Sequence, residues 1–173
     1  MEALKTFDVK ELLKRQAELD RKFDDKETLR KRTESRVLIA YFTELGELSQ
    51  ELKGEWNYWK NTAKRYDKNR VLEELSDVLH FFLSYLNLRK CMKTANFERL
   101  ELDIIQYHYN ESIEISLECL FDLDTILIGV EAYHYFRQML NIVMKIGASE
   151  QEFLKVHHEK WLKNMNERTK EEY

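Results

Sequence analysis

Apolar residues recur along most of the chain with the three-to-four-residue spacing of an amphipathic α-helix. A line of leucines that ends at Phe23 predicts a first helix, and Asp8 with Glu11 is typical of its N-terminal cap. Similar apolar lines over residues 37–52 and 71–86 predict a second and a third helix. We therefore expect three amphipathic helices in the first half of the chain.

The second half continues this pattern with less regularity. Residues 94–123 show a helical period, but their β-branched and aromatic residues also favour strands. Residues 125–146 predict a clearer helix, and Gly147 suits its C-terminus. A capping box formed by Ser149 and Glu152 predicts the start of a last helix.

Composition supports the same fold class. The 173 residues include no proline and only four glycines, as is typical of long helices with few sharp turns. The length suits one ordinary domain, and short helix connections favour antiparallel neighbours. We expect an all-α fold, an antiparallel bundle of about five to six helices that forms a single domain over residues 1–173.

Charge and cysteine content narrow the class of protein. A formal net charge of -4 argues against a broad nucleic-acid-binding face, so we expect no stable nucleic-acid binding. The N-terminus is too charged for a secretory signal, and the polar residues that interrupt the longest apolar stretch argue against a membrane span. Cys91 and Cys119 have no metal-ligand spacing and fit a reducing compartment. We expect a cytoplasmic protein without a membrane partner.

Two acidic pairs, Glu44 with Glu47 and Glu74 with Asp77, are the strongest chemical signal. Residues three apart share a helix face, so each pair directs two carboxylates the same way, beside the apolar stripe of its helix. Converging carboxylates repel each other unless cations neutralise them, and oxygen ligands suit Mg²⁺ or Mn²⁺. The alternative is that all four are solvated surface charges of a non-catalytic helical interaction protein.

A basic segment lies between the two acidic pairs and adds possible phosphate ligands. Metal-binding carboxylates together with cationic donors favour hydrolysis of a phosphoanhydride. The alternative is an ordinary solvated loop. The cationic residues of the segment are Lys60, Lys64, Arg65, Lys68 and Arg70.

Other residues could recognise a nucleobase. Trp56, Tyr58 and Trp59 offer flat apolar faces for stacking, although core packing is the commoner role of tryptophan. Gln16 lies on the apolar stripe of the first helix, and its carboxamide can match the donor and acceptor edge of a pyrimidine or bond to backbone groups. His80 could contact a base or sugar, or be structural.

The segments LLKRQAELD, TELGELSQEL, WNYWK and EELSDVLHFFLS, in that order, resemble the dimeric all-α dUTPase family, which belongs to the MazG-like group of nucleoside triphosphate pyrophosphohydrolases. The resemblance implies a MazG-like core, a homodimer and cleavage of dUTP to dUMP and pyrophosphate, which limits uracil in DNA. It also implies two or three Mg²⁺ ions per site, with Mn²⁺ as a substitute. Relatives that use the same carboxylates on dCTP or another nucleotide are the alternative.

The resemblance also implies roles for particular residues. The metal-binding and water-positioning carboxylates are Glu44, Glu47, Glu74 and Asp77, with Glu44 as the candidate for deprotonating water. The positions that match the deoxyuridine pocket are Gln16, Trp59, His80 and Phe81. The phosphate-binding candidates are Lys60 and, in a C-terminal motif, Lys160, Asn164 and Arg168. That motif departs from the family pattern at Thr169 and Glu172.

Overall fold

The computed structural model describes residues 2–25, 30–60, 65–90, 110–123 and 132–168. Within these ranges the chain forms seven α-helices, one terminal π-helical turn and no strand, which confirms the all-α prediction. The helices are α1 (Val9–Asp24), α2 (Glu34–Glu51), α3 (Lys53–Trp56), α4 (Lys68–Arg89), α6 (Ile113–Phe121), α7 (Ala132–Lys145) and α8 (Glu150–Lys163), and the π-helical turn η2 is Asn164–Arg168.

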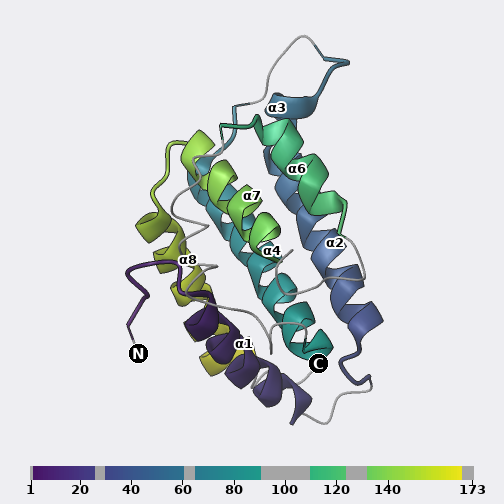
Figure 1. Ribbon diagram of the computed structural model, residues 1–173, viewed down its shortest axis with the longest axis vertical. Helices are drawn as coiled ribbons and strands as arrows, with labels where there is room; N and C mark the ends of the chain where they lie inside the picture. Colours follow the sequence, from purple (N-terminus) through teal and green to yellow (C-terminus); the bar gives the residue numbers. More distant parts are fainter. Residues whose placement is uncertain (1, 26–29, 61–64, 91–109, 124–131, 169–173) are drawn as a thin grey trace.

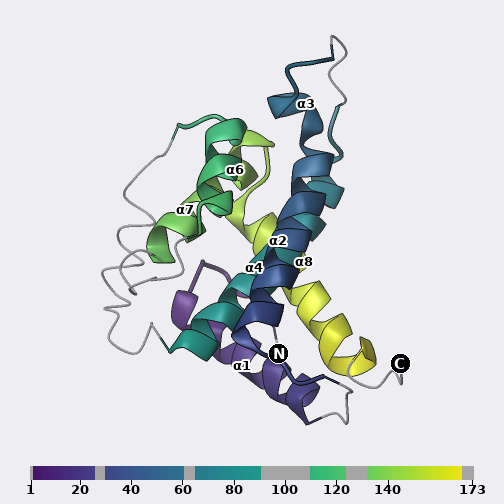
Figure 2. The same ribbon diagram turned by 90° about the vertical axis from the view of Figure 1, so that its right-hand side faces the viewer.

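Helix α4 lies at the centre of the bundle. It packs against α2 along most of its length and also against α1 and α8, while α6 packs on α7 and touches α2. Helices α2 and α4 run antiparallel and side by side (Figure 1). The short helix α3 lies beyond them at one end of the molecule, as the second view also shows (Figure 2).

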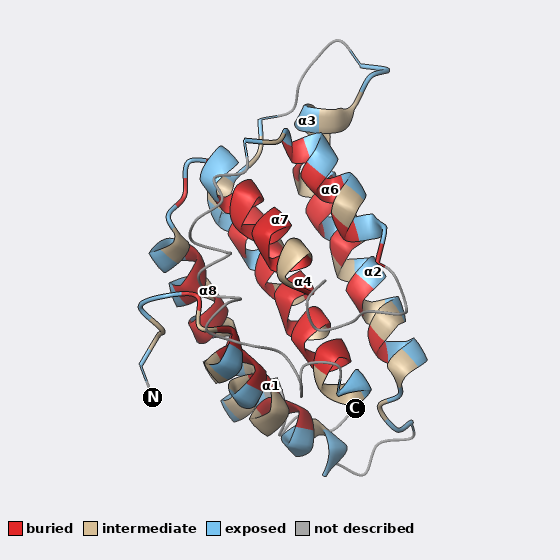
Figure 3. Ribbon diagram, in the orientation of Figure 1, coloured by how far each residue is buried: buried red, intermediate tan, exposed pale blue. Residues whose placement is uncertain are grey.

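The core follows the apolar stripes expected from the sequence. Buried residues line the inner faces of α4 and α7 and continue on their neighbours (Figure 3). On α4 the predicted stripe from Val71 to Leu86 is fully buried. The Tyr41 ring of α2 lies 6.0 Å from the Phe82 ring of α4, and its hydroxyl donates to the Leu120 carbonyl of α6 at 2.8 Å. Tyr41 therefore joins three helices.

Local signals fix several helix ends. The Asp8 side chain accepts a hydrogen bond from the backbone of the first turn of α1, as predicted. Ser149 and Glu152 form the reciprocal capping box at α8. Gly147 adopts a positive φ of 71°, a conformation that glycine tolerates without strain. The side chain of Asp67 caps the N-terminus of α4, a cap that was not predicted.

Only the end of residues 94–123, the segment with the irregular pattern, can be compared with the structure. Its end forms helix α6, so the helical alternative is correct there, whereas residues 91–109 lie outside the described ranges. The helix predicted over residues 125–146 is described as α7, Ala132–Lys145. Among the described helices, none has both the length and the apolar character needed to cross a membrane.

Candidate active site

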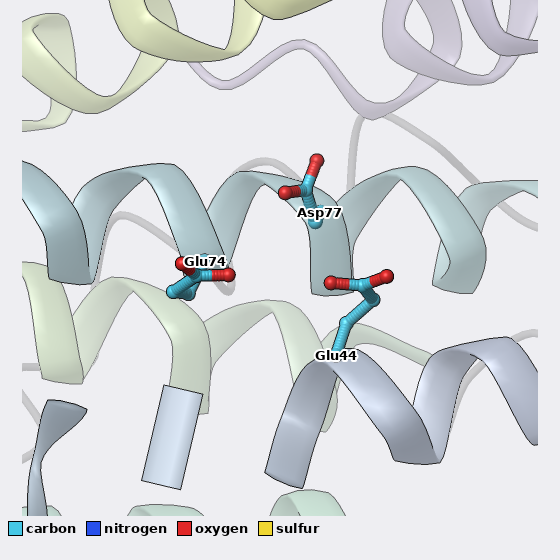
Figure 4. A group of neighbouring side chains, drawn as sticks. All are labelled: Glu44, Glu74 and Asp77. Carbon is cyan, nitrogen blue, oxygen red and sulfur yellow. The ribbon is translucent and has the colours of Figure 1, made fainter. Parts of the chain in front are cut away.

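Carboxylates from α2 and α4 converge where these two helices face each other. Glu44, Glu74 and Asp77 each offer one oxygen, and the three oxygens lie within 4.8 Å of one another (Figure 4). Leu45 and Leu75 are fully buried in the same helices, so the neighbouring carboxylates lie at the edge of the core and stay partly accessible. The structure thus brings together three of the four predicted carboxylates. We call this group the acidic cluster.

The carboxylates of the acidic cluster disfavour one another's charge. Burial, followed by the charges of Asp77, Glu47 and Glu74, raises the pKa of Glu44 to about 7. Burial also raises the pKa of Glu74, against the lowering effect of Lys160. Glu47 is exposed and does not belong to the cluster, although its charge acts on it.

The donor set of the acidic cluster fits a hard divalent cation. Only carboxylate oxygens are offered, and such ligands are preferred by Mg²⁺ and Mn²⁺ over softer metals. Burial is the main cause of the raised pKa of Glu44, and a bound cation would relieve the repulsion that adds to it. The cluster could therefore hold a metal ion.

Lys160 of α8 contacts the acidic cluster through Asp77 of α4. Its ammonium forms an ion pair with Asp77 and donates to the backbone carbonyl of Glu73 at 2.9 Å. The side chains of Lys160 and Asp77 are 24% and 21% exposed, so the pair is partly withdrawn from water. Lys160 therefore supplies positive charge to the acidic cluster.

A cavity of about 340 Å³ adjoins the acidic cluster. Its size lies at the lower end of the range for small-molecule sites. Glu44 and Asp77 line it, so cavity and cluster share two carboxylates. Its apolar lining comes from Leu19, Phe23, Val37 and Phe81, and its further polar lining from Gln16, Asp20, Arg32, Arg36, His80, Ser84 and Asn164. Four predicted substrate-binding residues, Gln16, His80, Phe81 and Asn164, thus lie around one cavity.

A chain of hydrogen bonds runs along the cavity wall. Gln16 Nε2 donates to Asp20 Oδ1 at 2.8 Å, and Gln16 Oε1 lies 2.7 Å from His80 Nδ1. Because that oxygen can only accept, His80 Nδ1 carries the proton. Arg32 Nη1 donates to Asp20 Oδ2 and to Ser84 Oγ, both at 3.1 Å. Burial raises the pKa of Asp20, while the Gln16 hydrogen bond and the Arg32 charge act against that rise.

Asp20, Arg32 and Ser84 were not predicted as site residues. Asp20 follows Gln16 by four residues on the same helix face, a spacing that could have identified it. Arg32 precedes α2 in a segment without periodic pattern, and only the tertiary structure brings it to α1. His157 was also not predicted to have a role, although its ring stacks on His80 with centroids 4.1 Å apart.

Of the remaining predicted residues, those with described side chains do not line the cavity. Trp59 and Lys60 follow α3 and are exposed. The Trp59 ring makes an edge contact with the Trp56 ring at 5.5 Å. Arg168 ends the π-helical turn, and its side chain lies outside the described part. The pocket roles of these residues stay predictions.

Comparison with known protein families finds a match over most of the chain. A family model described as dUTPase matches residues 8–173, which is nearly the whole chain. None of the curated proteins compared with the chain matches it. The matched region includes the acidic cluster and every residue that lines the cavity.

Proposed function

Because this chain belongs to the dUTPase family, we propose that it is a Mg²⁺-dependent dUTP pyrophosphohydrolase. In the proposed reaction, water and dUTP give dUMP and pyrophosphate, with cleavage between the α- and β-phosphates. Family membership supports nucleotide pyrophosphohydrolase activity in general. The choice of dUTP and of magnesium belongs to the proposal.

The observation that carries the proposal is the shared lining of the cavity. Gln16 and His80 provide polar groups suited to a base, and Glu44 and Asp77 line the same cavity within the acidic cluster. A nucleotide bound with its base beside Gln16 would place its phosphates towards the carboxylates. This arrangement supports a substrate that has both a base and a polyphosphate.

The residues of the acidic cluster have distinct proposed roles. Glu74 and Asp77 would hold the cation, which when bound would neutralise phosphate charge and make water more acidic. Glu44 would orient and deprotonate the attacking water, because burial raises the pKa of its carboxyl and makes it a better proton acceptor. Glu47 would be a further metal ligand, which requires its exposed side chain to change conformation.

Phosphate binding is assigned to cationic and amide groups around the cluster. Lys160 already contacts Asp77, and Asn164 lines the cavity, so both could reach a bound triphosphate. Trp59, Lys60 and Arg168 would join them only after movement of their segments or from a second copy of the chain.

We also propose that the protein is a homodimer of single-domain chains that span residues 1–173. A continuous family match over residues 8–173 supports one domain. The neighbouring helices α2 and α6 expose large apolar side chains that an interface would cover. These are Ile39, Phe42, Ile115 and Phe121. Light scattering of the purified protein would test the dimer.

Product analysis tests the proposed reaction. The protein is incubated with Mg²⁺ and each common deoxynucleoside triphosphate, and the products are separated by chromatography. We expect dUMP and pyrophosphate from dUTP, and a loss of at least about a hundredfold in Glu74→Gln. Glu73→Gln is the matched control, because Glu73 is the exposed neighbour outside the cluster. If only another nucleotide gives product, the proposed substrate is wrong. If no nucleotide is hydrolysed, the proposed reaction is refuted.

A further inference from the structure

The orientation of the Gln16 carboxamide is set by its two partners. An ionised carboxylate can only accept hydrogen bonds, so Asp20 Oδ1 requires the NH₂ group of Gln16 on its side. The Gln16 oxygen must then point to His80, at 2.7 Å from Nδ1. These two bonds use one N–H and one lone pair of the carboxamide, which leaves one of each for a ligand.

Arg32 determines how Asp20 is held. Its guanidinium is a permanent donor, and it contacts Asp20 Oδ2 at 3.1 Å while its other nitrogens bind both oxygens of Asp24, at 3.0 and 2.7 Å. Asp20 is only 5% exposed, and its two oxygens accept from different partners, one from Gln16 and one from Arg32. The order of donors and acceptors is therefore fixed from Arg32 through Asp20 to Gln16.

We propose that Asp20, positioned by Arg32, determines base specificity by locking the Gln16 carboxamide in the orientation that pairs with uracil and opposes cytosine. This inference rests on the proposed nucleotide hydrolysis. In uracil, O4 accepts and N3–H donates, so the locked amide can donate to O4 and accept from N3. In cytosine, N4–H₂ donates and N3 accepts, so the same amide meets donor against donor and acceptor against acceptor.

The base cannot escape this mismatch by turning over, because its triphosphate must reach the acidic cluster. The carboxamide cannot escape by rotating either. Rotation would turn the Gln16 oxygen to the Asp20 carboxylate and leave two buried acceptors in contact, which is costly. Gln16 alone could match either pyrimidine, and Asp20 removes that freedom.

The variant Asp20→Asn makes a sharp test because it is isosteric. Arg32 still offers only donors, so the oxygen of the new amide must turn to Arg32 and its NH₂ group to Gln16. Gln16 would then present its oxygen to position 20 and its NH₂ group to His80, the reverse of the native order. We expect the ratio of kcat/KM for dUTP to that for dCTP to fall by at least about tenfold, mainly through KM.

Two further variants separate orientation from charge. Asp24→Asn removes the same charge from the other carboxylate that binds Arg32, but Asp24 does not bond to Gln16. Arg32→Met removes the guanidinium while Asp20 still accepts from Gln16. Both variants should keep the native kcat/KM ratio within about threefold. The double variant Asp20→Asn with Arg32→Met should have a ratio between that of the native protein and that of Asp20→Asn.

The outcomes distinguish this inference from the proposed reaction. If the wild type hydrolyses no nucleotide, the proposed reaction fails and the inference fails with it. If the wild type hydrolyses dUTP but Asp20→Asn keeps its ratio within threefold, only the inference is refuted. An equal fall in Asp24→Asn would also refute it, because charge rather than amide orientation would then set the preference. Thermal melting of each variant checks that the fold is intact.

Discussion

Replacement of Lys160 by methionine should strengthen magnesium binding at the acidic cluster. Lys160 pairs with Asp77, a carboxylate that the cation also needs, so a bound cation competes with the ammonium. The variant removes this competitor and keeps a side chain of similar length. It also takes away the charge that lowers the pKa of Glu74, so the free cluster becomes more repulsive and gains more from a cation.

The magnitude follows from the exposure of the pair. With about a quarter of each side chain in water, the ion pair is worth about 1 kcal/mol of stability. If Mg²⁺ must break this ion pair to bind, a variant that lacks the pair should have a dissociation constant for Mg²⁺ about fivefold lower. The metal-free variant should lose a similar amount of unfolding free energy.

Isothermal titration of Mg²⁺ into metal-free protein without nucleotide measures this effect. Lys155→Met is the matched control: Lys155 lies on the same helix, is highly exposed, and pairs only loosely with Glu159 at 4.0 Å. The control should change the affinity by less than about twofold. Unchanged or weaker binding by Lys160→Met would refute the competition, and an equal gain in Lys155→Met would show that net charge alone is responsible.

Two stability predictions test other parts of the structure. Tyr41→Phe leaves the buried Leu120 carbonyl without its hydroxyl donor and should lower the unfolding free energy by about 1–2 kcal/mol in urea, with a change below about 0.5 kcal/mol contradicting the role of this bond. Burial lowers the pKa of His157 to about 3 from 6.5, so the unfolded chain binds a proton that the folded one does not, and stability should be lost as pH falls from about 7. His157→Phe should reduce the difference in Tm between about pH 7.5 and pH 5, and an equal difference would contradict this cause.

The helices could be predicted because they depend on interactions between residues that are close in the sequence. The apolar period on α4 is buried as expected, and the caps at Asp8 and Ser149 involve groups within three residues. Prediction is limited where a segment has no periodic pattern of apolar residues. The start of α2 depends on the Thr33 cap and on Arg32, and neither follows from an apolar stripe.

The acidic cluster was predictable only in part. The i, i+3 spacing identifies which carboxylates share a helix face, and this suffices for Glu74 and Asp77 on α4. It cannot fix the rotation of α2 against α4, which brings Glu44 inward and leaves Glu47 exposed. Nor can it bring Lys160 to Asp77, a contact between residues 83 positions apart. Both depend on how helices dock.

Arg32 connects the groups that hold Gln16 with the start of α2. It binds Asp20 and Asp24 of α1 and Ser84 of α4, immediately before the residue that caps α2. The contacts that order the Gln16 amide therefore also fix where α2 begins, and α2 carries Glu44 to the acidic cluster. Lys160 joins α8 to Asp77, another residue that lines the cavity. Base recognition and the carboxylate geometry thus depend on the same packing of α1 and α2 against α4.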